Sequence, residues 1–270
     1  MSDETRRVAL ITGGGTGIGA STAFVLRQQG WEVAICGRRL GCLDEVAERT
    51  GAIAFEADVA SPAGVRRLVA DTVERFGRLD GVVLNAGIVR PGAVGELGDD
   101  DWDAMVATNL TGPFQVARAA LPHLVETRGC LVGVASAAAL RATAATAGYN
   151  TTKAGLTMLM QSVAVDYGPS GVRANVICPG WTRTEMADME MTDLGAAIGV
   201  SRDRAYGLAT AFTPSRRPAE ADEIGQAIGW LLSPAASYVN AAVIPVDGGL
   251  IAVEPGQIAF DSRVTVRATT

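Results

Sequence analysis

The sequence predicts an α/β fold: a single doubly wound domain with a mostly parallel, seven-stranded sheet and helices on both of its faces. Two observations predict it. Short apolar runs alternate with amphipathic stretches of helical periodicity, and a glycine-rich turn follows the first run. Parallel strands need a crossover between them, which is usually a helix, so this alternation is typical of a parallel sheet. The apolar runs cover residues 7–11, 32–36, 52–57, 81–84, 130–135, 172–178 and 242–246.

The composition limits the domain count and the class of protein. The chain has 270 residues, which is room for one large core, and we assign residues 1–270 to a single domain. Hydrophobic residues make up 48% and charged residues 19%, which excludes global disorder. The net charge of −6 is opposite in sign to a nucleic-acid-binding surface. Because there is neither a long apolar segment nor a signal-like start, we expect a cytoplasmic protein that binds no membrane and no nucleic acid.

The four cysteines, at positions 36, 42, 130 and 178, do not form a metal-binding pattern. No two of them have C-x-x-C spacing, and His123 is the only histidine. A structural zinc site needs about four such ligands close together. We therefore expect no metal site, and we expect the cysteines to act as small buried residues.

Three helices follow from periodicity and from their end signals. Residues 20–29 form an amphipathic stretch that Gly30 closes. Residues 149–167 and 220–232 show the same spacing of apolar positions. Each of these stretches precedes one of the apolar runs, as a helix covering a parallel sheet would.

A fourth helical segment, residues 99–126, contains Pro113 and Pro122. Proline lacks the backbone donor that a helix interior needs, and its ring crowds the preceding turn. We expect this helix to be kinked or broken.

The glycine-rich turn joins the first predicted strand to the first predicted helix. It reads Thr12-Gly13-Gly14-Gly15-Thr16-Gly17-Ile18-Gly19. Glycine there permits a positive φ and lets a pyrophosphate approach the backbone, while the N–H groups of the helix start face the anion. Glycine turns also occur as plain structure. The strand before this turn and the helix after it favour a Rossmann domain that binds a dinucleotide.

Residues at the ends of later strands indicate which dinucleotide. Arg38 and Arg39 follow the second strand, where an enzyme that prefers NAD usually has an acidic residue. A 2′-phosphate would give these arginines a charge-assisted partner, and we expect no nearby carboxylate to oppose it. We therefore expect NADP(H), with NAD as the alternative. Asp58 is either an acceptor for an adenine amino group or a helix N-cap, and Asn85 lies at the predicted ligand-binding edge.

Tyr149 and Lys153 lie four residues apart on one face of a predicted helix. Lys153 is the only lysine, since the other 22 of the 23 basic residues are arginine. A free phenol has a pKa of about 10 and is a poor base near neutral pH. A neighbouring ammonium favours the phenolate, so we expect Lys153 to lower the pKa of Tyr149 and tune it for proton transfer. The alternative is a surface pair without a function.

These motifs have a characteristic order along the chain. They are Thr12-Gly13 to Gly19, Asp58-Val59, Asn85-Ala86-Gly87, Asn109, Ser136, Tyr149 with Lys153, Pro179-Gly180 and Asp247-Gly248-Gly249. In this order they resemble the short single-domain branch of the short-chain dehydrogenase/reductase family, over roughly residues 6–250. The resemblance implies a catalytic tetrad. Ser136 would hold the substrate oxygen, Tyr149 would pass a proton, Lys153 would bind the nicotinamide ribose, and Asn109 would hold a relay water.

The resemblance also implies a cofactor site, a substrate pocket and a homotetramer. The cofactor residues would be Gly13, Thr16, Gly17, Ile18, Gly19, Arg38, Arg39, Asp58, Val59, Asn85, Ala86, Gly87, Tyr149, Lys153, Pro179, Gly180, Thr182 and Thr184. The substrate residues would be Ser136, Ala138, Leu140, Tyr149, Trp181, Met186 and Met189, with Ala137, Val89 and Val94 facing them. A substrate lid would span about residues 181–215. The tail, residues 250–270, lies outside the family pattern, and we expect it to pack across a subunit boundary.

The expected reaction interconverts a ketone and a secondary alcohol with NADP(H). The methionines of the lid favour a small to medium, largely apolar carbonyl compound, whereas Arg141 near the pocket would favour an acidic one. Three alternatives stay open: an NAD-dependent alcohol dehydrogenase, a catalytically silent nucleotide-sensing regulator, and a sugar-nucleotide epimerase or dehydratase. The last usually has a larger C-terminal domain than residues 180–270 can supply.

Overall fold

A computed structural model of the chain describes residues 6–260. Seven strands form one sheet in the order β3-β2-β1-β4-β5-β6-β9, and every neighbouring pair is parallel. The predicted seven-stranded α/β fold is confirmed, and its sheet is parallel throughout. The strands are β1 (Val8–Thr12), β2 (Glu32–Gly37), β3 (Ile53–Glu56), β4 (Gly81–Leu84), β5 (Cys130–Val134), β6 (Arg173–Pro179) and β9 (Val243–Val246).

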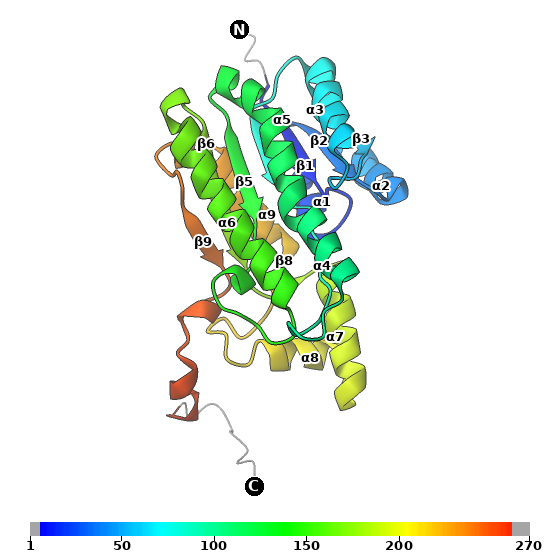
Figure 1. Cartoon of the computed structure of the whole chain (residues 1–270), viewed down its shortest axis with the longest axis vertical. Helices are drawn as coiled ribbons and strands as arrows, with labels where there is room; N and C mark the ends of the chain where they lie inside the picture. Colours follow the sequence, from blue (N-terminus) through cyan, green and yellow to red (C-terminus); the bar gives the residue numbers. More distant parts are fainter. Residues whose placement is uncertain (1–5, 261–270) are drawn as a thin grey trace.

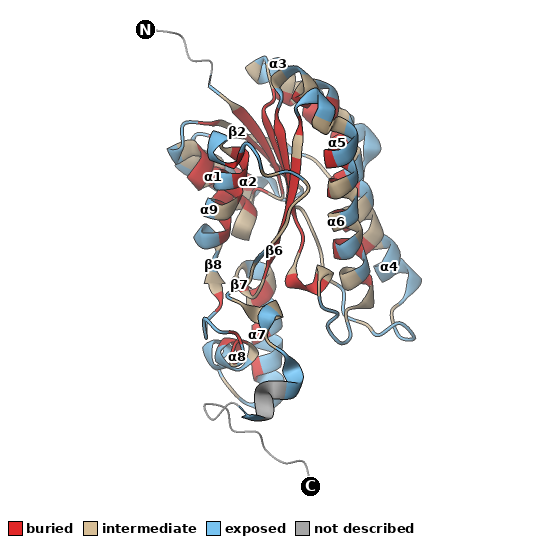
Figure 2. Cartoon of the chain, turned by 90° about the vertical axis from the view of Figure 1, so that its left-hand side faces the viewer, coloured by how far each residue is buried: buried red, intermediate tan, exposed pale blue. Residues whose placement is uncertain are grey.

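Helices cover both faces of the sheet (Figure 2). Alternate residues of a strand point to opposite faces, so Val8 and Leu10 of β1 enter one hydrophobic core while Ala9 and Ile11 enter the other. The first core lies under α3 (Pro62–Phe76), α5 (Gly112–Thr127) and α6 (Ala147–Tyr167). The second lies under α1 (Gly17–Gln28), α2 (Leu40–Thr50) and α9 (Ala221–Leu232).

The predicted break in the long helical segment is confirmed. The helix α4 (Asp99–Val106) leads into a π-helical turn, Ala107–Thr111, before α5 begins. Pro113 explains the position of the turn, because it has no N–H to donate to the carbonyl of Asn109 four residues earlier. Pro122 lies inside α5 without ending it.

A small subdomain lies beyond the carboxyl ends of the strands (Figure 1). It contains α7 (Glu185–Ile198), α8 (Arg202–Ala209) and a pair of two-residue strands, β7 (Thr182–Arg183) and β8 (Ala219–Glu220). Four residues form its own buried cluster: Ala187, Met191, Ala205 and Tyr206. Short 3₁₀ turns cover Ala137–Ala139, Gly168–Ser170, Pro234–Ala236, Leu250–Ala252 and Pro255–Phe260.

The helix boundaries differ from the predicted ones by a few residues. α1 begins at Gly17, inside the glycine-rich turn, and α6 begins at Ala147. Tyr149 is therefore in the first turn of its helix. No helix in the described part of the chain is both long and apolar enough to span a membrane.

Candidate active site

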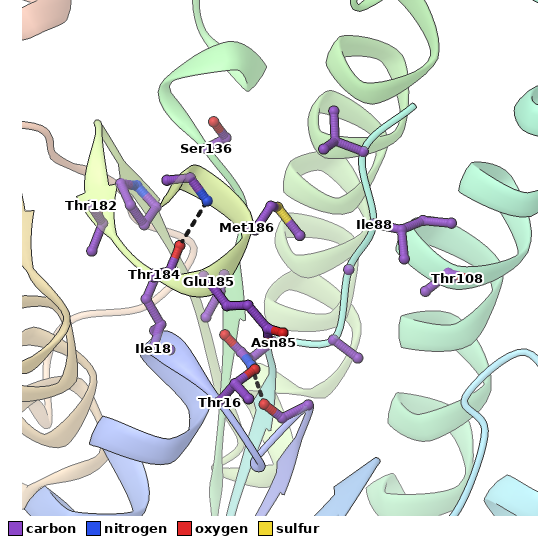
Figure 3. Close-up of a pocket in the computed structure, with 18 of the residues that line it drawn as sticks. Thr16, Ile18, Asn85, Ile88, Thr108, Ser136, Thr182, Thr184, Glu185 and Met186 are labelled. Atoms are coloured by element: carbon purple, nitrogen blue, oxygen red, sulfur yellow. Dashed lines mark hydrogen bonds between the residues drawn. The ribbon is translucent and has the colours of Figure 1, made fainter. Parts of the chain in front are cut away.

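One cavity of about 430 Å³ lies at the carboxyl ends of the strands, beneath α7 (Figure 3). This edge includes the point between β1 and β4 where the strand order reverses, which is where open α/β sheets bind ligands. Most of the residues predicted for the cofactor line it. They are Gly13, Thr16, Gly17, Ile18, Arg38, Arg39, Asp58, Val59, Asn85, Ala86, Gly87, Tyr149, Lys153, Pro179, Gly180, Thr182 and Thr184.

The glycine-rich turn is tied to the end of β4 by two polar side chains. The hydroxyl of Thr12 accepts hydrogen bonds from the backbone N–H of Asn85 and Ala86 at 3.0 and 3.1 Å. The amide of Asn85 donates back to the carbonyls of Thr12 and Gly13 at 2.9 and 3.1 Å. These bonds join the loop after β1 and the loop after β4 into one rigid unit.

The glycines of the turn serve two different purposes. Gly13 and Gly17 have φ of +65° and +52°, and Gly17 packs against Thr184. Within residues 6–260, Gly19 is not among the residues that line the cavity. A Cβ there would lie 2.2 Å from the carbonyl oxygen of Gly13, so Gly19 allows α1 to pack under the turn. Its place on the cofactor stays a prediction.

The start of α1 fits the phosphates of a dinucleotide. Thr16 is the N-cap but its side chain caps no backbone N–H, and Gly17 and Ile18 line the cavity. The first N–H groups of a helix have no partner within the helix and attract anions. A Cβ on Gly13 would lie 2.9 Å from the side-chain nitrogen of Asn85 and 3.0 Å from the Cα of Ala86, so this close approach of the turn to the end of β4 requires glycine.

The two arginines after β2 have different partners. Arg39 forms two parallel hydrogen bonds with the carboxylate of Glu185, at 2.7 and 2.6 Å. These bonds lower the pKa of Glu185 and raise that of Arg39. Arg38 lines the cavity, and no hydrogen bond or ion pair joins it to another described residue. The expectation that no carboxylate opposes the arginines is therefore wrong for Arg39, since the fold brings Glu185 to it from 146 residues away.

Asp58 lines the cavity and does not cap a helix. Its carboxylate accepts a hydrogen bond from the N–H of Ala60 at 2.9 Å. Ser61 is the N-cap of α3, accepting from the N–H of Gly64 at 3.2 Å. The N-cap alternative is thus wrong, and Asp58 is left facing the cavity.

Ser136, Tyr149 and Lys153 converge at the end of β5. Lys153 is only 4% exposed, and its ammonium donates to the carbonyl of Val134 at 2.8 Å. It also lies 5.6 Å from the centre of the Tyr149 ring. The hydroxyl of Ser136 accepts from the N–H of Ala138 at 3.1 Å and hydrogen bonds with the phenol of Tyr149.

The pKa of Tyr149 moves in the direction opposite to the expected one. Burial raises it to about 12, and the hydrogen bond with Ser136 opposes that rise. Burial also lowers the pKa of Lys153 to about 8. Loss of water outweighs the attraction between ammonium and phenolate because the ammonium bonds to Val134 and not to the phenol.

Asn109 supports the site from behind. It is fully buried in the π-helical turn, and its side chain accepts from the N–H of Ile88 and donates to the carbonyl of Ile88, both at 2.8 Å. It also donates to the hydroxyl of Thr152 at 3.2 Å. The side chain is therefore committed to holding the loop after β4, next to Gly87.

The substrate end of the cavity differs from the expected one. Ser136, Ala137, Ala138, Tyr149, Val89, Trp181 and Met186 line it. Within residues 6–260, the cavity lining does not include Leu140, Met189 or Val94. Leu140 packs against the core under α6, while Met189 is 59% and Val94 86% exposed. Arg141 is exposed and donates to the carbonyl of Leu140.

Sequence reasoning missed the carboxylate of Glu190, which lines the cavity. Helical spacing could have made it a candidate, because Met189 and Glu190 lie three and four residues after Met186, on the same broad face of α7. Of the two, the structure within residues 6–260 places Glu190 in the cavity lining. Glu185 could not have been found in that way, since its partner lies on another element. Among the described residues, no group of three or more acidic, histidine or cysteine side chains is placed to hold a metal ion.

Comparison with known proteins places this site in a family. Residues 13–251 match the family profile described as enoyl-(acyl carrier protein) reductase. Levodione reductase of Leifsonia aquatica is 35% identical over 254 residues, which is 91% of this chain and 94% of that one. The chain belongs to the short-chain dehydrogenase/reductase family of oxidoreductases.

Other known proteins match this chain along nearly their whole length. Protein MoaE of Klebsiella aerogenes is 41% identical over 259 residues, covering 94% of this chain and 99% of that one. The crystal structure of levodione reductase superposes with a TM-score of 0.87 over 92% of this chain and 98% of that one, at 35% identity. A variant of actinorhodin polyketide ketoreductase with NADPH has the same TM-score at 32% identity, over 93% and 99% of the two chains.

Proposed function

We propose that the protein interconverts a ketone and a secondary alcohol by hydride transfer with NADP(H). The observation that carries the proposal is the convergence of Ser136, Tyr149 and Lys153 on one cavity whose other end is a phosphate cradle. The names of similar proteins support it: meso-2,3-butanediol dehydrogenase and levodione reductase are 32% and 35% identical to the chain.

Each polar side chain of the site has a role in this reaction. Ser136 donates a hydrogen bond to the substrate oxygen and holds it against the phenol of Tyr149. Tyr149 donates a proton to that oxygen during reduction and takes one during oxidation. A phenol with a pKa of about 12 is protonated at neutral pH, which suits the reductive direction. The nicotinamide cofactor, when bound, supplies or accepts the hydride.

Lys153 and Asn109 would complete the proton path. The buried ammonium of Lys153 has two donors left beyond its bond to Val134, one for the cofactor ribose and one for a relay water. The side chain of Asn109 is occupied by Ile88 and Thr152. Its backbone carbonyl, which Pro113 cannot reach with a hydrogen bond, is the group that would hold the relay water.

The choice of NADP(H) depends mainly on Arg38. Its guanidinium faces the cavity without a protein partner among residues 6–260, so a 2′-phosphate would be its natural ligand. Arg39 can contribute only if the phosphate displaces Glu185. NAD stays the alternative because this carboxylate lies at the same end of the cavity.

Residues 181–215 would act as the substrate lid, and the enzyme would be a cytoplasmic homotetramer. Large hydrophobic side chains stay exposed on the covering helices, among them Phe114, Met158 and Trp230 at 42%, 63% and 42%. A second copy of the chain would bury them. The tail, residues 250–270, would pack across the same boundary; residues 261–270 of it lie outside the described part. Light scattering should give a mass near four chains, and a monomer would contradict the assembly.

The test is a screen of the purified protein against a panel of ketones with NADPH and NADH, and of secondary alcohols with the oxidised cofactors. Consumption of NADPH that depends on a ketone, and that Tyr149→Phe abolishes, is the expected result. Cofactor binding without turnover of any ketone or alcohol would favour a nucleotide-sensing regulator and contradict the proposal.

A further inference from the structure

The charged groups that line the cavity are unevenly distributed. Arg39 and Glu185 neutralise each other through two short hydrogen bonds. Lys153 is buried against Val134 and belongs to the reaction centre. Arg38 and Asp58 follow β2 and β3, at the end of the cavity opposite to α6. The carboxylate of Glu190, on α7, is the remaining charged group of the lining.

The direction of Glu190 follows from the packing of α7. Thr184 caps the helix by accepting from the N–H of Ala187 at 3.2 Å, and it packs against Gly17 of the glycine-rich turn. Ala187 and Met191 are buried in the cluster with Tyr206 of α8. With both of these contacts made, the face that carries Met186 and Glu190 points into the cavity. Figure 3 shows Glu185 and Met186 extending from the start of α7 into this space.

Glu190 is close enough to Tyr149 for its charge to act on the phenol. That charge contributes to the raised pKa of Tyr149, and burial raises the pKa of Glu190 itself. No hydrogen bond or ion pair joins Glu190 to another residue of the described part. Glu190 is an exposed residue at the cavity wall, so its carboxylate keeps contact with solvent on one side. An unpaired carboxylate in this position attracts a cation or a strong donor and repels an anion.

The same wall offers nothing to an anion. Arg141, the cation that would have favoured an acidic substrate, is exposed and bonds to the carbonyl of Leu140. The neutral polar groups near Tyr149 are the hydroxyls of Ser136, Thr143 and Thr146. A carboxylate or phosphate on the substrate would be repelled by Glu190, and the ammonium of Lys153 is already assigned to Val134, the cofactor ribose and the relay water.

We propose that Glu190 is a specificity-determining residue that selects substrates bearing a protonated amine near the reacting carbon, so that the substrate is an amino alcohol or the corresponding amino ketone. This rests on the proposed oxidoreductase function. In the oxidative direction the C–H and O–H bonds of the carbinol break and a C=O bond forms. The hydride goes to the nicotinamide. The hydroxyl proton goes to Tyr149 after the phenol has released its own proton through Lys153 and the relay water to solvent. The ammonium stays paired with Glu190.

The test compares two isosteric pairs of alcohols, 1-amino-2-propanol against 2-butanol and 4-amino-2-butanol against 2-pentanol. Within each pair an ammonium replaces a terminal methyl group of similar size. The ammonium also changes the intrinsic reactivity of the alcohol, so kcat/KM for the amino alcohol is first divided by kcat/KM for its alkyl counterpart. The quantity to follow is this ratio in the wild type divided by the same ratio in Glu190→Gln. We expect this quotient to be about 10 to 100 for at least one pair, the range of a hydrogen bond to a charged group.

Asp193→Asn is the matched control, because Asp193 is exposed on the same helix and is not among the cavity-lining residues. It should leave both ratios unchanged. If the neutral alcohols are oxidised and the ratios are the same in the wild type and in Glu190→Gln, the role of Glu190 is contradicted while the oxidoreductase function stands.

A second measurement needs no turnover. With saturating NADP⁺, 1-amino-2-propanol should raise the unfolding temperature of the wild type more than 2-butanol does, and Glu190→Gln should remove the difference. Equal shifts by the two alcohols in the wild type would overturn the proposal, even if no alcohol were oxidised. Absence of turnover in the first experiment would instead count against the oxidoreductase function.

Discussion

The two walls of the cavity are built in different ways. The sheet wall, formed by the strand ends and α6, places its polar groups inside the main cores: Asn109 is fully buried and Lys153 is 4% exposed. The lid wall, formed by α7, is held by a cluster of four buried residues and by ion pairs at the surface. The groups proposed for chemistry thus have fixed positions, whereas the groups proposed for specificity lie on an element that can vary without disturbing the core.

The largest expected effect is on the sheet wall. Tyr149→Phe removes the transferable proton, and kcat should fall by about 10²–10⁴-fold, the usual contribution of a general acid. Cofactor affinity, measured by fluorescence titration, should stay within about twofold, since the hydroxyl is the only group lost. On the lid, Met189→Ala should change kcat little, because Met189 is 59% exposed and outside the cavity. If Tyr149→Phe kept more than a tenth of the wild-type kcat, Tyr149 would not be the general acid, and the proposed difference between the two walls would be contradicted.

Two glycines in the helices next to these walls test the difference by stability: Gly19 lies in α1, beside the strand ends, and Gly207 lies in α8, which packs against α7. A Cβ on Gly19 would lie 2.2 Å from the carbonyl of Gly13, whereas one on Gly207 in α8 would meet nothing within 4 Å. Gly19→Ala should lower the free energy of unfolding by about 3 kcal/mol or prevent folding, as overpacked sites do. Gly207→Ala should raise it by about 0.5–1 kcal/mol through the helix propensity of alanine. Urea denaturation measures both, and similar effects at the two positions would contradict the difference in rigidity.

The preference for NADPH over NADH tests the contact between the two walls, which is the ion pair of Arg39 with Glu185. Arg38→Ala should lower kcat/KM for NADPH by about 10-fold to 100-fold and change that for NADH little, because only NADPH has the 2′-phosphate. Glu185→Gln should act in the opposite direction, raising kcat/KM for NADPH several-fold by freeing Arg39. A wild-type preference for NADH, or an unchanged NADPH value in Arg38→Ala, would show that the arginines do not choose the cofactor.

The smallest effect is a pH dependence of binding. Burial lowers the pKa of Lys153 to about 8, so its ammonium is present below that pH and is lost as the pH rises through it. The affinity for NADPH should therefore fall by about threefold to tenfold between pH 7 and 9.5, where the 2′-phosphate is already fully ionised, as one hydrogen bond to a charged donor weakens. Fluorescence titration across this range measures it. Lys153→Met should bind more weakly at every pH and lose the step; a wild type without the step would contradict the role of the ammonium.

Local patterns in the sequence were enough for much of the framework. The continuous apolar run of β1, the prolines of segment 99–126 and the glycines before α1 act through neighbouring backbone. The strands, the broken helix and the turn could therefore be predicted from the residues themselves. The spacing of Tyr149 and Lys153 likewise needs only a helix to place both side chains on one face. Of the turn, only the separate packing role of Gly19 was not predictable.

Charge and exposure were decided by the tertiary structure. The pairing of Arg39 with Glu185 spans 146 residues, and no local pattern indicates it. The direction of the pKa shift at Tyr149 depends on how much water the folded chain removes, which outweighs the nearby ammonium. Whether Met189 or Glu190 faces the cavity depends on the rotation of α7, which is set by its contacts with Gly17 and Tyr206. Periodicity fixes which residues share a face, but only packing against distant segments determines where that face points.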